Sequence, residues 1–194
     1  MLEIKNIYKT FNPGTINEKV ALNGLSLKLN EGDFVTVIGG NGAGKSTMLN
    51  AVAGVWPVDE GQIIIDGTDV TKLSEYKRAA YLGRVFQDPM TGTAATMGIE
   101  ENLALAKRRG KTRLLRPGIT KAERAEYKEL LKILNLGLED RLTSKVGLLS
   151  GGQRQALTLL MATLQKPKLL LLDEHTAALD PKTAAKVLDI TDKI

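Results

Sequence analysis

A glycine-rich segment, Gly39-Gly-Asn-Gly-Ala-Gly-Lys45-Ser46-Thr47, constrains the fold more than any other part of the chain. It fits the pattern G-x-x-x-x-G-K-[ST], in which successive backbone N–H groups cradle the α- and β-phosphates of a nucleotide. In this pattern Lys45 reaches the β- and γ-phosphates, and the hydroxyl of Ser46 coordinates Mg²⁺. The segment therefore predicts a phosphate-binding loop.

The flanking residues provide the setting that such a loop requires. Residues 34–38 are apolar and β-branched, which predicts a buried strand, and residues 45–53 predict a helix closed by Gly54. The alternative is an ordinary glycine-rich turn. A strand, a loop and a helix in this order favour phosphate binding, because the helix N-terminus adds a positive dipole end.

Length and composition restrict the class of protein to which the chain can belong. A chain of 194 residues with 43% apolar content predicts one domain, with room for an inserted lobe. No apolar run approaches the ~18 residues of a membrane span, so we expect a soluble, cytosolic protein. The chain has no cysteine, which excludes disulfides and thiolate metal sites, and its net charge of +5 is compatible with a phosphate site or an anionic membrane surface.

The remaining pattern predicts an α/β fold with two lobes. Residues 2–8, 20–29 and 62–66, separated by turn residues, predict an antiparallel sheet. Residues 96–136 predict helices. Strands alternating with helices elsewhere predict a parallel, doubly wound core. The elements assigned to that core are a helix over 74–80, a strand over 81–86, a helix over 154–165, a strand over 169–173 and a helix over 181–194.

Two features define the helical part. Ile99, Leu103 and Leu105-Ala106 are spaced to form one apolar helix face. Thr120-Lys-Ala-Glu123 fits a capping box, which predicts a second helix that ends near Gly137.

Two acids follow the apolar strand Leu169–Leu172, for which we expect burial on both faces. Asp173 would hold Mg²⁺, and Glu174 would orient and polarise an attacking water. Ordinary surface acids after a strand are the alternative. The phosphate loop elsewhere in the chain favours the catalytic interpretation.

The segment Leu149-Ser-Gly-Gly-Gln153, followed by Arg154-Gln155 and the Asp173-Glu174 strand, resembles the signature of the ATP-binding-cassette (ABC) ATPases, and the resemblance extends over the whole chain. It implies a P-loop NTPase (RecA-like) fold with a parallel-sheet core, an antiparallel β lobe and an inserted helical lobe. The single domain, residues 1–194, would comprise the β lobe and nucleotide-binding core (about 1–87), the helical lobe with the signature (about 88–153) and the remainder of the core (about 154–194).

The resemblance also implies roles for particular residues. Glu174, Gln87 and Lys45 would be catalytic, and Ser46, Gln87 and Asp173 would bind Mg²⁺. Phe11 would stack on adenine, with Tyr8 as a weaker candidate; a core aromatic is the alternative for Phe11. The residues expected to bind ATP are Phe11, Gly39, Asn41, Gly42, Ala43, Gly44, Lys45, Ser46, Thr47, Ser150, Gly151, Gly152 and Gln153, the last four acting on the nucleotide of a second subunit.

Near the C-terminus the resemblance implies two departures and one further motif. His175, the only histidine, follows Glu174 where many relatives have proline, and we interpret it as a structural substitution. The family's switch histidine would lie beyond Ile194, so the chain is expected to be a truncated cassette. Ala178-Leu179-Asp180 resembles the loop that crosses the dimer interface.

The basic run at residues 107–116 has three interpretations. We favour a solvated edge of the helical lobe over contact with anionic lipid or a membrane partner, and nucleic-acid binding ranks third because stacking aromatics are lacking.

The family implies the ATPase subunit of a transporter for a small solute, located on the inner face of the cell membrane. The expected partners are a head-to-tail second copy or a related cassette, membrane-spanning permease subunits and a substrate-binding protein, with no nucleic acid. Residues 85–93 and 173–182 resemble importers of aromatic amino acids. A non-transport cassette that acts on DNA or ribosomes is the alternative.

Overall fold

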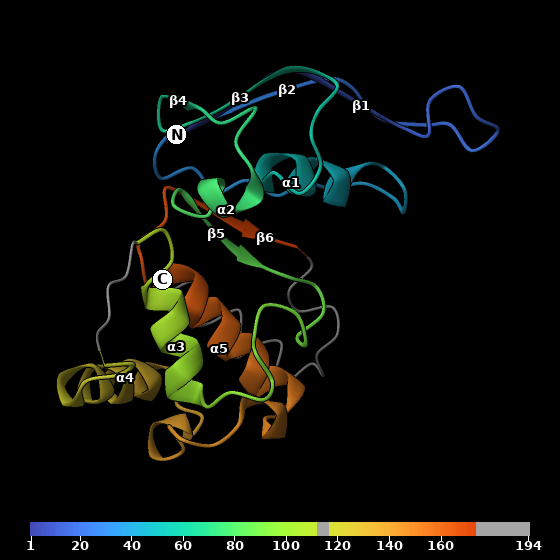
Figure 1. Cartoon of the computed structure of the whole chain (residues 1–194). Coiled ribbons are helices and arrows are strands. Elements are labelled where there is room, and N and C mark those ends of the chain that lie inside the picture. Colours follow the sequence, from blue (N-terminus) through green and yellow to red (C-terminus); the bar gives the residue numbers. More distant parts are fainter. Residues whose placement is uncertain (112–116, 174–194) are drawn as a thin grey trace. The chain divides into compact units, whose positions relative to one another are not determined.

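The computed structural model describes residues 1–111 and 117–173 (Figure 1). Glu174, His175, the predicted interface loop 178–180 and the predicted helix over 181–194 lie outside the described residues. The chain divides into two compact units, Met1–Gly83 and a second that begins at Arg84, and each is described by itself. None of the helices within 1–111 and 117–173 is long and apolar enough to cross a membrane.

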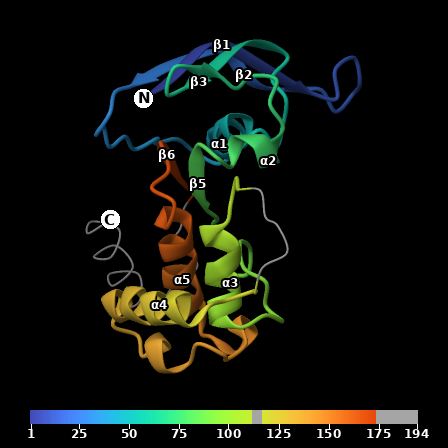
Figure 2. The ribbon, with the colours of Figure 1, turned by 60° about the vertical axis from the view of Figure 1, so that its left-hand side comes forward.

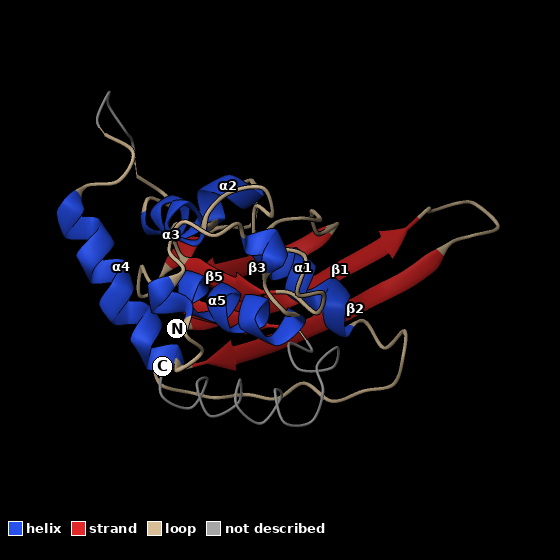
Figure 3. Ribbon diagram, turned by 90° about the horizontal axis from the view of Figure 1, so that it is seen from below, coloured by secondary structure: helices blue, strands red, loops and turns tan. Residues whose placement is uncertain are grey.

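The first unit is built on an antiparallel sheet with strand order β2-β1-β3-β4 (Figure 3), which confirms the predicted sheet. Its bounds are β1 Leu2–Phe11, β2 Lys19–Leu29, β3 Glu60–Ile65 and β4 Thr68–Asp69. Asp66 and Gly67 join β3 to β4 with φ of 50° and 77°, as a tight hairpin turn of type I′ requires. The sheet is thus specified by local turn chemistry as well as by alternation.

A bulge keeps the apolar residues of β1 on one face. Leu2, Ile4 and Ile7 are all buried, although strict alternation would place Ile7 on the opposite face from Ile4. The pairing with β2 and with β3 shifts after Ile4, and Asn6 adopts a φ of 45°. The extra residue turns Ile7 back into the core.

Helix α1, Lys45–Ala53, has the predicted bounds, and it contacts β2 of this sheet. Gly54 ends α1 with a φ of 84°, a left-handed conformation that glycine adopts without strain. A Cβ at this position would also lie 2.7 Å from Nε of Arg78. Position 54 therefore requires glycine for both its backbone angle and its space.

Arg78 links α1 to the rest of the first unit. It lies at the end of the short helix α2, Glu75–Arg78, which confirms the helix predicted over 74–80 with shorter bounds. Its side chain is 1% exposed, and it donates only to backbone carbonyl groups, including two in the last turn of α1. The acceptors are the oxygens of Ala51 (2.7 Å), Val52 (2.9 Å), Leu73 (2.9 Å) and Thr71 (2.8 Å).

In the described part of the second unit, helices α3, α4 and α5 pack around an apolar core (Figure 2). Their bounds are α3 Ile99–Lys107, α4 Lys121–Leu134 and α5 Gly151–Thr163. Thr120 and Glu123 form the predicted capping box of α4, and the described helix ends before Asn135. Ile99 and Leu103 are buried as expected, but Leu105 is 55% exposed because two further residues turn its side chain about 200° away from Leu103.

Strands β5 Leu82–Val85 and β6 Leu169–Leu172 form a second sheet, and β5 spans the division between the units. The N–H of Asp173, just past the end of β6, donates to the carbonyl of Val85 at 3.2 Å. Because this bond joins the carboxyl ends of both strands, the pair is parallel, as the predicted core requires. Leu171 of β6 is buried, whereas Leu170 and Leu172 are half-buried against the helical core, so the expected burial on both faces is only partial.

Two further expectations are wrong. Residues 34–38 form no strand, since neither sheet includes them, and Phe34 and Ile38 are 82% and 90% exposed. An apolar β-branched run becomes a strand only where a neighbouring strand completes its hydrogen bonds. Helix α5 begins at Gly151, three residues before the predicted start at Arg154, because Ser150 caps it.

We predict that Arg78→Met lowers the free energy of unfolding by about 3 kcal/mol, because two buried and two partly buried carbonyl groups lose a charged donor. Urea unfolding followed by circular dichroism measures the change. Lys77→Met is the matched control, since Lys77 lies on the same helix and is exposed. Equal stability of the two variants would contradict the role given to Arg78.

Candidate nucleotide site

The phosphate loop has the backbone that its sequence predicts. Gly42 and Gly44 adopt φ of 81° and 87°, which only glycine does readily. A Cβ at Gly44 would lie 2.6 Å from the carbonyl oxygen of Ala21, so the loop also runs too close to β2 for any side chain there. Left-handed residues alternating with other conformations turn successive N–H groups toward one side, which forms a concavity for an anion.

Lys45, the first residue of α1, folds back over this loop. Its ammonium Nζ donates to the carbonyl oxygens of Gly39 and Gly40 at 2.7 and 3.3 Å. Both acceptors are neutral. Phosphate oxygens carry a full charge and bind an ammonium more strongly, so they can replace the carbonyls. Ser46 and Thr47 follow in the first turn of α1.

Phe11, at the end of β1, is half-buried and has an aromatic neighbour. The rings of Phe11 and Trp56 meet edge to face, with centroids 5.0 Å apart and planes 82° apart. Nζ of Lys9 lies 5.7 Å from the Phe11 centroid. Trp56 was not singled out from the sequence, although it is the only tryptophan and so was a signal.

Asp59 holds the strand end that carries Phe11. Its carboxylate accepts a hydrogen bond from Nζ of Lys9 at 2.8 Å and one from the N–H of Thr10 at 2.6 Å. The bond from Lys9 and then that from Thr10 keep the pKa of Asp59 below its ordinary value. The carboxylate thus fixes the position of the last residues of β1.

Gln87 and Asp173 lie at one edge of the β5–β6 pair. Both follow the carboxyl ends of their strands, which the Asp173–Val85 hydrogen bond places next to each other. Gln87 is exposed and Asp173 is half-buried. Gln87 and Asp173 belong to the second unit, whereas the phosphate loop, Ser46 and Phe11 belong to the first. Among residues 1–111 and 117–173, no three His, Cys, Asp or Glu side chains group as a metal site.

The signature residues form the start of α5. Ser150 is its N-cap, with a capping box in which the N–H of Gln153 donates to Ser150 Oγ (3.3 Å) and the N–H of Ser150 donates to Gln153 Oε1 (3.2 Å). The first N–H groups of a helix have no partner within the helix. Gly151 and Gly152 hold two of these groups, and the Ser150 hydroxyl accepts one bond while keeping its proton to donate.

Helix α5 also binds residues on both sides of Gln87. Arg154, 4% exposed, donates to Thr93 Oγ1 at 2.7 Å and to the carbonyl of Met90 at 3.2 Å. Gln155, fully buried, donates from Nε2 to the carbonyl of Phe86 at 3.1 Å. The sequence interpretation missed both roles. The available signal was that two long polar side chains come immediately before the apolar stretch of this helix.

The basic run is tied into the second unit over its described part. Lys107 pairs with Glu126, and Arg108 pairs with Glu123 at 2.9 Å. Arg109 donates to the carbonyl of Ala162 at 3.2 Å, and burial lowers its pKa. The favoured interpretation of a solvated edge is wrong for residues 107–109, because they join α3 to α4 and α5. Residues 112–116 lie outside the described part.

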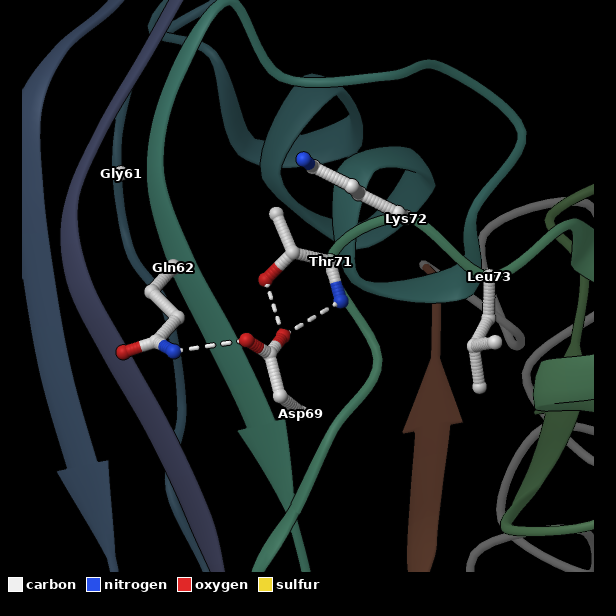
Figure 4. Close-up of a pocket in the computed structure, with 6 residues that line it drawn as sticks. All are labelled: Gly61, Gln62, Asp69, Thr71, Lys72 and Leu73. Carbon is white, nitrogen blue, oxygen red and sulfur yellow. Dashed lines mark hydrogen bonds between the residues drawn. The ribbon is translucent and has the colours of Figure 1, made fainter.

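A separate hollow lies beside the β3–β4 hairpin (Figure 4). Its carboxylate, Asp69, accepts hydrogen bonds from Thr71 Oγ1 (2.6 Å), Gln62 Nε2 (2.6 Å) and the N–H of Thr71 (2.9 Å). These bonds, that from the Thr71 hydroxyl first, lower the pKa of Asp69 to about 2. Thr71 Oγ1 also accepts from the N–H of Ile63 at 2.8 Å, so we interpret the group as a structural staple.

Comparison with known proteins places this geometry among nucleotide-binding proteins. A family model described as "ABC transporter" matches residues 22–177. The chain is 48% identical over 200 residues to a tyrosine transport ATP-binding protein of Clostridioides difficile, covering 100% of the chain and 77% of the relative. It is 37% identical over 199 residues to a methionine import ATP-binding protein of Corynebacterium diphtheriae, covering 100% of the chain and 54% of that relative.

The similar solved structures are also ATP-binding cassettes. A dimeric ATP-binding cassette bound to ADP and Pi, in a post-hydrolysis state, matches with a TM-score of 0.82 and 32% identity, covering 100% of this chain and 82% of that one. A nucleotide-free cassette from an ABC transporter matches with a TM-score of 0.79 and 27% identity, covering 100% and 76%. The fold is therefore that of a P-loop ATPase cassette.

We predict that Asp69→Asn makes stability less dependent on pH in acid. The pKa of about 2 lies below the unfolded value of about 3.9, so the carboxylate stabilises the fold fully above about pH 4 and loses this effect as the pH falls through about 2. Urea unfolding between pH 2 and 6 should show wild type and variant converging toward pH 2. Glu60→Gln, an exposed acid on β3, is the control; a gap that stays constant down to pH 2 would contradict the prediction.

Proposed function

The chain belongs to the ABC transporter family, and from this premise we propose how its residues bind and hydrolyse ATP. The protein is the ATP-binding and hydrolysing subunit of an ABC transporter. The observation that carries the proposed site is the phosphate loop, in which left-handed Gly42 and Gly44 form a concavity and Lys45 covers it through replaceable carbonyl contacts.

In the proposed site the adenine ring stacks on Phe11, which Trp56 supports edge-on. The N–H groups of residues 39–47 bind the phosphates, and Lys45 exchanges its carbonyl acceptors for β- and γ-phosphate oxygens. Fixing Lys45 in advance near the loop reduces the entropy lost when the nucleotide binds. Gly39, Asn41, Ala43 and Thr47 belong to the same cradle.

The two acids at the end of β6, Asp173 and Glu174, have different roles in the proposed hydrolysis. Ser46, Gln87 and Asp173 would hold Mg²⁺, which would neutralise negative charge on the phosphates when bound. Their oxygen atoms are the donors that this ion prefers. Glu174 orients a water molecule and takes a proton from it as the water oxygen attacks the γ-phosphorus. The bond from that phosphorus to the bridging oxygen of ADP then breaks, which yields ADP and phosphate.

The signature helix would act on the nucleotide of a second copy. Ser150, Gly151 and Gly152 present N–H groups and one hydroxyl proton at a helix N-terminus, which suits an anion. The capping box with Gln153 holds them rigid. We infer a head-to-tail dimer with two composite sites, and the dimeric cassettes among the similar structures support it.

The transport role implies partners. We propose that the subunit lies on the inner face of the cell membrane and drives membrane-spanning subunits, in a system that includes a substrate-binding protein. Relatives named for transport or import support this role. An aromatic amino acid is the proposed cargo, because the relative named for tyrosine transport is 48% identical.

We predict that one variant weakens ATP binding and that another slows ATP hydrolysis without weakening binding. Lys45→Ala should raise the Kd for ATP by tenfold to a hundredfold, because one charge-assisted contact is lost. Glu174→Gln should keep the Kd and lower phosphate release by about 10²–10⁴-fold, since an amide cannot accept the proton. Calorimetric titration and a phosphate-release assay measure these effects. Glu174→Gln with lost binding or full turnover would contradict its role.

We predict that Ser150→Arg leaves ATP binding by one copy within twofold of wild type but prevents the ATP-dependent dimer, because a bulky cation blocks the close approach of a partner. Sedimentation velocity in a Glu174→Gln background measures the dimer. Ser74→Arg is the matched control, since Ser74 is another exposed N-cap serine. A Ser150→Arg protein that dimerises and hydrolyses ATP normally would remove the case for a site shared between copies.

A further inference from the structure

Lys19, the first residue of β2, lies beside the phosphate loop, although no sequence motif marks it. Its Nζ is 3.7 Å from the position that a Cβ on Gly42 would occupy. Two residues further along β2, the carbonyl oxygen of Ala21 closely approaches Gly44. The start of β2 therefore runs along the loop, and Lys19 places its charge at the loop's edge.

The register of the sheet places Lys19 next to the proposed adenine platform as well. Lys19 and Phe11 are direct partners in the antiparallel pair of β1 and β2, and Thr10 pairs with Val20 in the same register. Directly paired residues project their side chains on the same face of a sheet, about 5 Å apart at Cβ. The backbone of Lys19 thus lies beside Phe11, and its ammonium group lies beside Gly42.

The charge of Lys19 is available to a ligand. The ammonium of Lys9, on the neighbouring strand, is paired with Asp59 at 2.8 Å. Lys19 is exposed and makes no ion pair with any residue in 1–111 or 117–173. Lys45 covers the loop from the helix side. An unpaired cation at the strand side of an anion-binding loop has a ligand of opposite charge as its natural partner.

We propose that Lys19 binds the α-phosphate of the nucleotide, an inference that rests on the function proposed above. Adenine on Phe11 and the β- and γ-phosphates at Lys45 leave the ribose and the α-phosphate to cross the space between the platform and the loop. Lys19 spans that interval and is a cation, so the α-phosphate is the group that it fits. It contributes to ATP and ADP equally, because both nucleotides carry this phosphate.

The test compares Lys19→Met with wild type by calorimetric titration of ATP and ADP at one fixed ionic strength. We expect the Kd of each nucleotide to rise by about tenfold, by the same factor for both, and Lys19→Arg to retain most of the affinity. Lys28→Met is the matched control, because Lys28 is an exposed lysine near the other end of β2, opposite Glu3 in the strand register. It should bind both nucleotides as wild type does.

Three outcomes would overturn the proposal. They are unchanged affinity in Lys19→Met, a loss confined to ATP, which would place the ammonium at the γ-phosphate, and an equal loss in Lys28→Met, which would indicate a general effect of surface charge. Lys45→Ala separates this proposal from the function itself. If Lys45→Ala loses ATP while Lys19→Met keeps it, only the role of Lys19 fails; if wild type does not bind ATP, the proposed site fails.

Discussion

One buried guanidinium fixes the helix on which the phosphate loop depends. Arg78 binds the last carbonyl groups of α1 and, through Thr71, the β3–β4 hairpin with its Asp69 staple. A cation at this end of a helix also suits its dipole, whose positive end faces the loop. Gly54 makes the contact possible, because a side chain there would collide with Arg78. The loop is thus held from the far end of its own helix.

Each unit carries its own part of the proposed site. The first unit contains Phe11, the phosphate loop, Lys19 and Lys45. The second unit contains Gln87, Asp173 and the signature. Within the second unit α5 serves two purposes, because its first turn presents Ser150 and its second turn grips Phe86 and the segment after Gln87 through Arg154 and Gln155. Any movement of that segment therefore bears on the helix that carries the signature.

Local signals in the sequence predicted much of the fold, and contacts between distant residues account for what it missed. The left-handed end of α1 at Gly54 and the capping box at Thr120 depend on neighbouring residues, and both were predicted. Residues 34–38 needed a strand partner that the pattern could not supply. The phosphate-loop and signature motifs can be recognised from neighbouring residues. Trp56, Arg78 and Lys19, in contrast, lie next to residues far away in the sequence, and no local spacing predicts such proximity.

The central claim, that a second copy completes each ATP site, has a direct test because the chain contains no cysteine. Gly40→Cys places a thiol on the loop without a clash, and Leu148→Cys, at a position 71% exposed, places one just before the signature. The two single variants, each also carrying Glu174→Gln, are mixed and treated with a short bismaleimide. We predict a cross-link that joins position 40 of one copy to position 148 of the other and forms only with MgATP. Cross-links that form equally without nucleotide, or only between two identical variants, would contradict the claim.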